Sequence, residues 1–69
     1  MKTVKTKIDE LAKLANKIYQ LQLEVARGMA EMGEEGRQDL IEYAAEYRGD
    51  SPIIDDTIDA YMYNYDMYI

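Results

Sequence analysis

The sequence predicts an all-α fold, a small three-helix bundle that forms a single domain over residues 1–69. Apolar side chains recur at spacings of three and four along most of the chain, which is typical of helices with one buried face. Two glycine-containing breaks, at residues 33–36 and 48–52, divide this pattern. We therefore expect one long helix over about residues 3–32 and two shorter helices over about residues 35–47 and 52–68.

The long helix is predicted by an uninterrupted apolar seam with one polar member. The seam consists of Ile8, Leu11, Ala15, Ile18, Gln22, Val25, Met29 and Met32. Leucines and alanines on both flanks widen it, which favours a bundle helix that faces two neighbours over a two-stranded coiled coil. For Gln22 two alternatives stay open: it fixes the register of a helical dimer, or it faces solvent at the edge of the seam.

The second helix is predicted after the Gly33–Gly36 break, because two glycines in four residues favour a helix end and a turn. Its apolar face contains Leu40, Ile41, Ala44 and Tyr47. The opposite face carries four acidic residues at spacings of four, three and four, namely Glu35, Asp39, Glu42 and Glu46. Residues at such spacings share one side of a helix, so we expect a continuous row of carboxylates.

The third helix is predicted from Pro52 onwards. Gly49 suits a left-handed helix end, Ser51 suits an N-cap, and Pro52 suits the first helical position. Ile54, Ile58, Tyr61, Tyr65 and Tyr68 continue the apolar spacing. The alternating tyrosines leave three alternatives open for residues 61–69, namely helix, edge strand or tail, and we favour helix. Met62 and Tyr63 lie off the apolar seam, which indicates an interface.

The charge of the chain is divided unevenly. Residues 1–27 carry six basic and three acidic side chains, a balance of +3, whereas residues 28–69 carry eleven acidic side chains and two arginines, a balance of −9. We expect the two acidic helices to lie along the basic half of the long helix. Strong negative charge disfavours direct binding to nucleic acid or to anionic lipid, so the expected partner is a protein, and its expected feature is a basic groove.

The candidate partner-binding residues are acidic or aromatic side chains of the second half: Glu35, Asp39, Glu42, Tyr43, Glu46, Tyr47, Asp55, Asp56, Asp59 and Tyr63. Side chains three or four apart on a helix are separated by roughly 5–6 Å, a scale similar to the spacing of phosphates along a nucleic-acid strand. Tyrosine and methionine are common at binding surfaces. The alternative is a solvated acidic face that only keeps the protein soluble.

We expect no enzyme activity and no cofactor. Histidine and cysteine are absent, and the chain is too short to form a deep catalytic pocket. A metal site is also not expected, because Asp55, Asp56 and Asp59 do not match a calcium-loop pattern. The basic start of the chain is followed by Asp9 and Glu10 without an apolar run, so we expect neither a signal peptide nor a membrane span, and a cytoplasmic location.

In its composition and charge layout the chain is similar to small acidic proteins, often from phages and mobile elements, that occupy the nucleic-acid groove of a host enzyme. The function that this likeness implies is inhibition of a CRISPR effector, a restriction enzyme, a glycosylase or a polymerase by mimicry of nucleic acid. The alternative function is a helical assembly protein that associates with copies of itself, for which the heptad seam is the supporting feature. A homodimer is compatible with both functions.

Overall fold

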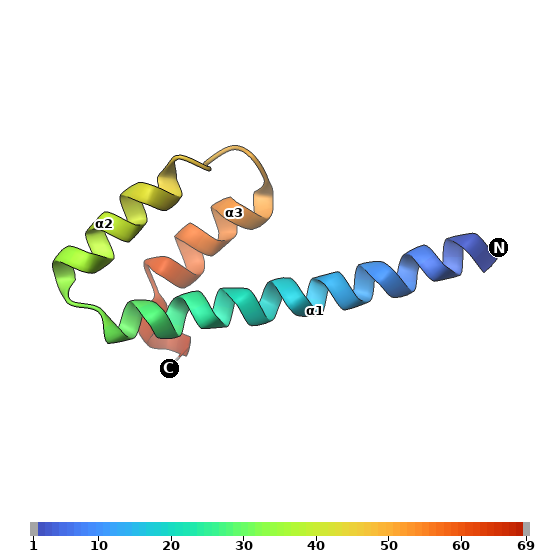
Figure 1. The fold of residues 1–69 in the computed structure, drawn as a ribbon, viewed down its shortest axis with the longest axis horizontal. Coiled ribbons are helices and arrows are strands. Elements are labelled where there is room, and N and C mark those ends of the chain that lie inside the picture. Colours follow the sequence, from blue (N-terminus) through green and yellow to red (C-terminus); the bar gives the residue numbers. More distant parts are fainter. Residues whose placement is uncertain (1, 69) are drawn as a thin grey trace.

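The computed structural model describes residues 2–68, and within this range every regular element is helical, which confirms the all-α class. Helix α1 spans Lys2–Glu31, α2 spans Glu34–Ala45 and α3 spans Pro52–Asp56. The chain then continues as a π-helical turn, η1 (Thr57–Met62), and a 3₁₀ turn, η2 (Tyr65–Tyr68). In Figure 1, α2 and α3 form an antiparallel hairpin that stands on the C-terminal half of α1.

The N-terminal half of α1 leaves the body of the molecule as a straight helix, which we call the arm (residues 2–17) (Figure 1). Every residue from 3 to 17 is exposed. The expectation that the acidic helices lie along the basic half of α1 is therefore wrong. Ile58, Met62 and other apolar side chains of the second half pack with Val25 and Met29 instead, and this places the hairpin on the C-terminal half of α1, away from the lysines of the arm.

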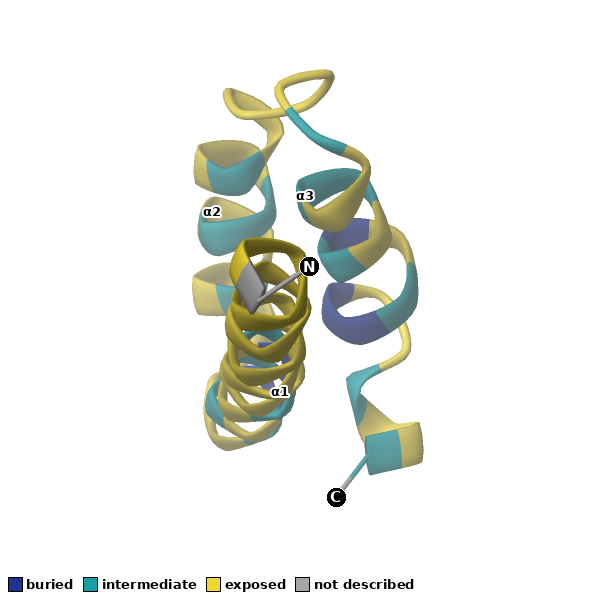
Figure 2. Cartoon of the chain, turned by 90° about the vertical axis from the view of Figure 1, so that its right-hand side faces the viewer, coloured by how far each residue is buried: buried dark blue, intermediate teal, exposed yellow. Residues whose placement is uncertain are grey.

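The core is small and lies where the hairpin meets α1. Met29, Ile58 and Met62 are its buried centre, and half-buried side chains surround them. The surrounding side chains are Val25, Leu40, Ile41, Ala44, Ile54 and Tyr65. Figure 2 shows the buried residues where η1 faces α1, while the arm is exposed along its length.

The turns follow the local sequence signals. Gly49 has φ of +87°, a left-handed conformation that glycine adopts without steric cost. The Ser51 hydroxyl accepts a hydrogen bond of 3.0 Å from the Ile53 amide, and Pro52 is the first residue of α3, so both predictions are confirmed. Gly33 is the residue before α2, and α2 begins one residue earlier than predicted.

The end of the third helix departs from α-helical geometry. The Tyr63 amide donates to the carbonyl of Ile58, five residues earlier, at 3.2 Å, and this defines the wider π-helical turn. The turn brings Ile58, Tyr61 and Met62 to the buried side together, so the placement of Met62 at an interface is wrong. Residues 61–68 contain no strand, and residue 69 lies outside the described residues.

Candidate partner-binding surface

The four carboxylates of α2 form one continuous row, which we call the acidic stripe (Glu35, Asp39, Glu42 and Glu46). All four side chains are exposed. The opposite side of α2 carries Leu40, Ile41 and Ala44, which pack against the core and hold the helix in this orientation. Glu35 also lies in the first turn of α2, where negative charge is favoured by the helix dipole.

Both arginines of residues 28–69 are bound to other parts of the protein. The Arg37 guanidinium donates to the carbonyl of Met29 at 2.7 Å and lies 4.5 Å from the ring centroid of Tyr65. Arg48 donates two hydrogen bonds to the Asp59 carboxylate and forms a longer ion pair of 4.0 Å with Asp55. Neither arginine is paired with a carboxylate of the acidic stripe in any contact of the described residues.

The three candidate aspartates of the third helix have internal partners. Asp59 binds Arg48, and this hydrogen bond is the main reason why the pKa of Asp59 is lowered from its ordinary value of 3.8. Asp55 accepts a hydrogen bond of 3.1 Å from the Gly49 amide, which holds the loop before α3. Asp56 accepts from the Nε2 atom of Gln22 at 3.1 Å. These contacts hold the hairpin together, and Asp56 and Asp59 are nevertheless exposed.

Gln22 matches neither of the two alternatives predicted for it. Its side chain is only 8% exposed, and Nε2 lies 3.1 Å from both Asp56 Oδ2 and Thr57 Oγ1. Thr57 in turn donates to the carbonyl of Ile53 at 2.7 Å. The polar member of the seam therefore joins α1 to the hairpin within one chain.

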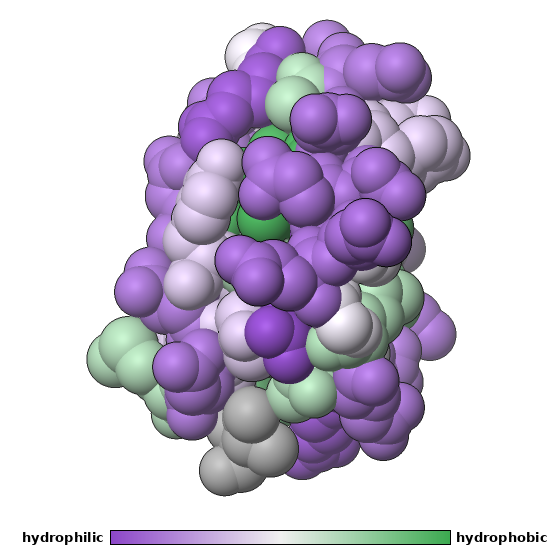
Figure 3. Space-filling model, turned by 90° about the vertical axis from the view of Figure 1, so that its left-hand side faces the viewer, coloured by the Kyte–Doolittle hydropathy of each residue, from purple (hydrophilic) through white to green (hydrophobic). Residues whose placement is uncertain are grey.

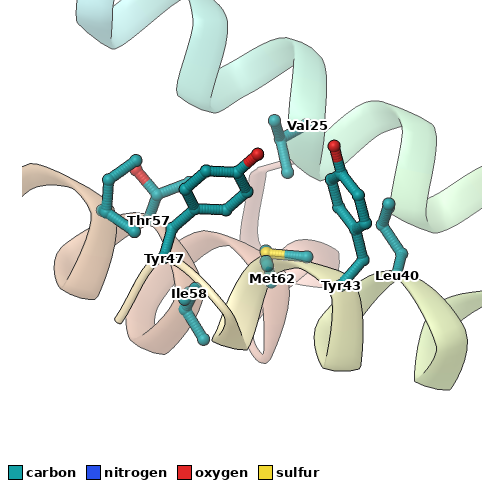
Figure 4. Close-up of a pocket in the computed structure, with 9 residues that line it drawn as sticks. Val25, Leu40, Tyr43, Tyr47, Thr57, Ile58 and Met62 are labelled. Atoms are coloured by element: carbon teal, nitrogen blue, oxygen red, sulfur yellow. The ribbon is translucent and has the colours of Figure 1, made fainter. Parts of the chain in front are cut away.

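Tyr43 and Tyr47 lie beside an apolar recess between the hairpin and the part of α1 that follows the arm, which we call the notch. Its main lining residues are Ile18, Val25, Tyr43, Tyr47, Ile53 and Ile54. The two rings pack edge to face with centroids 5.9 Å apart, and in Figure 4 their hydroxyl ends point toward α1. The pKa of Tyr47 is raised, mainly by its hydrogen bond with Tyr43, and also by the nearby charges of Glu46 and Asp50.

Tyr63 lies on another side of the hairpin. It is 56% exposed and lines a shallow recess together with Arg37, Gln38 and Ile41. The ten candidate residues thus occupy three places: the outer side of α2, the notch and hairpin turn, and the region around η1. Figure 3, which views the end of the molecule opposite to the arm, shows mostly hydrophilic side chains around a small apolar centre.

Sequence reasoning missed the apolar residues of the notch. Val25, Ile53 and Ile54 line it together, although Val25 is separated from the two isoleucines by 28 and 29 residues. A local signal exists in the adjacent pair Ile53–Ile54, because two neighbouring residues of a helix cannot both face the same core. Ile53 is the one that remains 43% exposed.

Comparison with protein-family models, with curated proteins and with solved structures gives no match to this chain. Within residues 2–68, no helix combines the length and the apolar character that crossing a membrane requires. The same residues contain no group of three or more side chains placed to hold a metal ion.

Proposed function

We propose that this protein inhibits a nucleic-acid-handling host protein by placing the acidic stripe in that protein's basic groove, and that it is of viral or mobile-element origin. The target classes are a CRISPR effector, a restriction enzyme, a glycosylase or a polymerase. The four carboxylates of the stripe take the place of phosphates. The proposed mechanism is stoichiometric occlusion of the groove and involves no chemical step.

The observation that carries this proposal is the exposure of all four stripe carboxylates on one side of a helix whose other side is held by the core. A row of carboxylates on an ordered helix offers a groove negative charges at roughly 5–6 Å intervals, and because the backbone is already ordered, only side-chain entropy is lost on binding. Binding between such surfaces depends on complementary charge, which accelerates association and makes it sensitive to salt.

The internal contacts of Arg37 and Arg48 also support the proposal. Because both guanidinium groups are bound elsewhere, the −9 charge of residues 28–69 is not neutralised at the stripe. Tyr43 follows Glu42 in the chain and is 59% exposed, so an aromatic ring borders the row of carboxylates. Such a ring can fill an apolar or base-stacking pocket of the partner.

The experiment uses two variants with the same net charge. In the stripe variant, Glu35→Gln, Asp39→Asn, Glu42→Gln and Glu46→Gln are combined. In the matched control, Asp9→Asn, Glu10→Gln, Glu24→Gln and Asp66→Asn remove four exposed carboxylates elsewhere. Each set changes the formal charge of the chain from −6 to −2. Unequal behaviour therefore reports the position of the charges, because the total charge is the same.

Each protein is immobilised and used to capture proteins from a nuclease-treated lysate of the source or host cell. We expect the native chain and the control to retain a nucleic-acid-handling enzyme that added DNA or RNA displaces, and the stripe variant to lose it. Equal losses in both variants would reduce the stripe to a solubilising face. Retention that added nucleic acid does not reverse would contradict occupation of the groove.

A further inference from the structure

The arm carries an apolar side that nothing in the described chain covers. Val4, Ile8, Leu11 and Leu14 are between 55% and 66% exposed. Their spacing continues through Ile18 into the part of α1 that meets the hairpin, so the apolar side of the arm leads directly into the notch. The arm is continuous with the part of α1 that packs against the hairpin, and covering its apolar side would stabilise it by removing apolar surface from water.

The notch is the second uncovered apolar surface. Tyr43, Tyr47 and Ile53 are 59%, 46% and 43% exposed, respectively. Because α1 is straight, Val4 lies about 21 Å from Ile18 along the helix axis, so the arm cannot fold back to fill the notch of its own chain. The described residues therefore leave the notch open.

The charges indicate which occupant fits the notch. The arm, residues 2–17, has five lysines against Asp9 and Glu10, a balance of +3, and the remaining residues have a balance of −9. Glu46 directly precedes Tyr47 in the chain, and the Asp50 amide donates to the carbonyl of Tyr47 at 3.1 Å, so two carboxylates border this end of the notch. A helix that is basic and apolar on one side fits this recess, and the arm of another copy is such a helix.

We propose that two copies of the chain form an antiparallel dimer in which the apolar side of each arm packs on the other arm and each arm tip enters the partner's notch. The two contacts are equivalent by a two-fold axis, as is usual for homodimers. A parallel dimer would also pack the two arms together, but it would place the two acidic bodies side by side, which like charges disfavour.

A stable dimer needs only a modest share of the surface of this chain. A standard interface buries roughly 800 Å² per partner, which is about one seventh of the 5483 Å² accessible surface. The arm, whose residues 3–17 are all exposed, and the notch are the surfaces that would be buried. This inference does not rest on the proposed inhibitory function, since its evidence is the uncovered apolar side of the arm and the notch.

Sedimentation equilibrium across micromolar to millimolar concentrations tests the dimer. We expect Leu11→Glu to raise the dimer dissociation constant about a hundredfold, because it places a charge in the buried arm contact. Leu11 is 66% exposed within one chain, so the substitution leaves the monomer fold intact, and circular dichroism checks this. Asn16→Glu makes the same change of charge at an exposed position on the other side of the arm, and we expect less than a threefold effect from it.

Cross-linking tests the antiparallel arrangement, and the chain has no native cysteine to interfere. A mixture of the Val4→Cys and Ile53→Cys proteins is treated with a short bis-maleimide. We expect a 4–53 cross-link between two chains and no 4–4 cross-link in the Val4→Cys protein alone. A chain that stays monomeric throughout the concentration range would overturn the proposal. So would a dimer that gives the 4–4 cross-link, or one without the 4–53 cross-link.

Discussion

The guanidinium of Arg37 lies over the ring of Tyr65, 4.5 Å from its centroid. The same guanidinium donates to the carbonyls of Met29 at 2.7 Å and Ala30 at 3.4 Å, near the C-terminal end of α1. One side chain of α2 thereby binds carbonyls of the last turn of α1 and holds η2 against the body. Arg37 joins three elements that have few other polar contacts.

We expect Arg37→Lys to lower the free energy of unfolding by about 1–2 kcal/mol. Lysine keeps the charge but has a single ammonium group, which cannot contact the two carbonyls and the ring in the same planar arrangement. Urea denaturation measures the change. Arg27→Lys, at an exposed position of α1, is the control and should change the unfolding free energy by less than about 0.5 kcal/mol. Equal changes in the two variants would contradict the role given to Arg37.

Gln22 provides a second prediction, since its amide connects α1 to Asp56 and Thr57. Gln22→Leu should cost about 1 kcal/mol of unfolding free energy, because the volume is kept and the hydrogen bonds are lost. Gln22→Glu should cost more at neutral pH, because two carboxylates then face each other, and the extra cost should disappear in acid. The exposed Gln20→Glu is the control. If both glutamate variants unfold at the same urea concentration, Gln22 is not such a connection.

Two glycines are predicted to respond to alanine with opposite signs. Gly28 lies inside α1, and a methyl group there would meet nothing within 4 Å, so Gly28→Ala should raise the unfolding free energy by about 0.5–1 kcal/mol. Gly49 has φ of +87°, so Gly49→Ala should lower it by about 1 kcal/mol. Thermal and urea denaturation of the two variants provides the comparison. If both substitutions change the unfolding free energy in the same direction, either the helical conformation of Gly28 or the left-handed conformation of Gly49 is contradicted.

The Arg48–Asp59 pair predicts how stability depends on pH. The pKa of Asp59 is lower in the folded chain than in the unfolded chain, chiefly because Arg48 hydrogen-bonds to the ionised carboxylate. Its contribution is therefore present above the unfolded value, near 3.8, and is lost as the pH falls through the lower folded value. Urea midpoints measured from neutral pH to strong acid should decline less in Asp59→Asn than in the native chain. The exposed Asp66→Asn should follow the native curve.

The buried side chain of Tyr61 predicts how the unfolding free energy depends on pH in the alkaline range. Tyr61 is 8% exposed and stacks on Tyr68 with ring centroids 4.4 Å apart, and burial is the main cause of its raised pKa. The stability that it contributes is complete below its ordinary value of 10.0 and is lost as the pH rises through the folded value. Tyr61→Phe should reduce the alkaline decline of the unfolding free energy. If the unfolding free energy of Tyr61→Phe declines at alkaline pH as steeply as that of the native chain, burial of the Tyr61 hydroxyl is not the cause of the decline.

The parts of the fold that depend on neighbouring residues were predictable from the sequence. The N-cap at Ser51, the left-handed Gly49 and the buried side of Ile58 and Tyr61 each follow from a few adjacent positions. Met62 was misplaced because a π-helical turn changes which residues share a side, and no α-helical spacing describes it. The exposure of the acidic stripe follows from its spacing alone.

The arrangement of the hairpin on α1 was not predictable in this way. It depends on which apolar residues fit together, and the choice of Val25 and Met29 leaves the lysines of the arm without the acidic neighbours expected for them. The internal partners of Asp55 and Asp59 were missed for a similar reason. Arg48 reaches Asp59, 11 residues away, only because the turn at Gly49 reverses the chain.

The salt dependence of partner binding tests the central claim, that the acidic stripe is the surface by which this protein holds a basic groove. The dissociation constant of the captured partner is measured at several salt concentrations for the native chain, the four-residue stripe variant and its charge-matched control. We expect the affinity of the native chain and of the control to fall steeply as the salt concentration rises. We expect the stripe variant to bind weakly, with an affinity that changes little with salt concentration. Native affinity that does not change with salt, or a stripe variant that binds like the control, would contradict this claim.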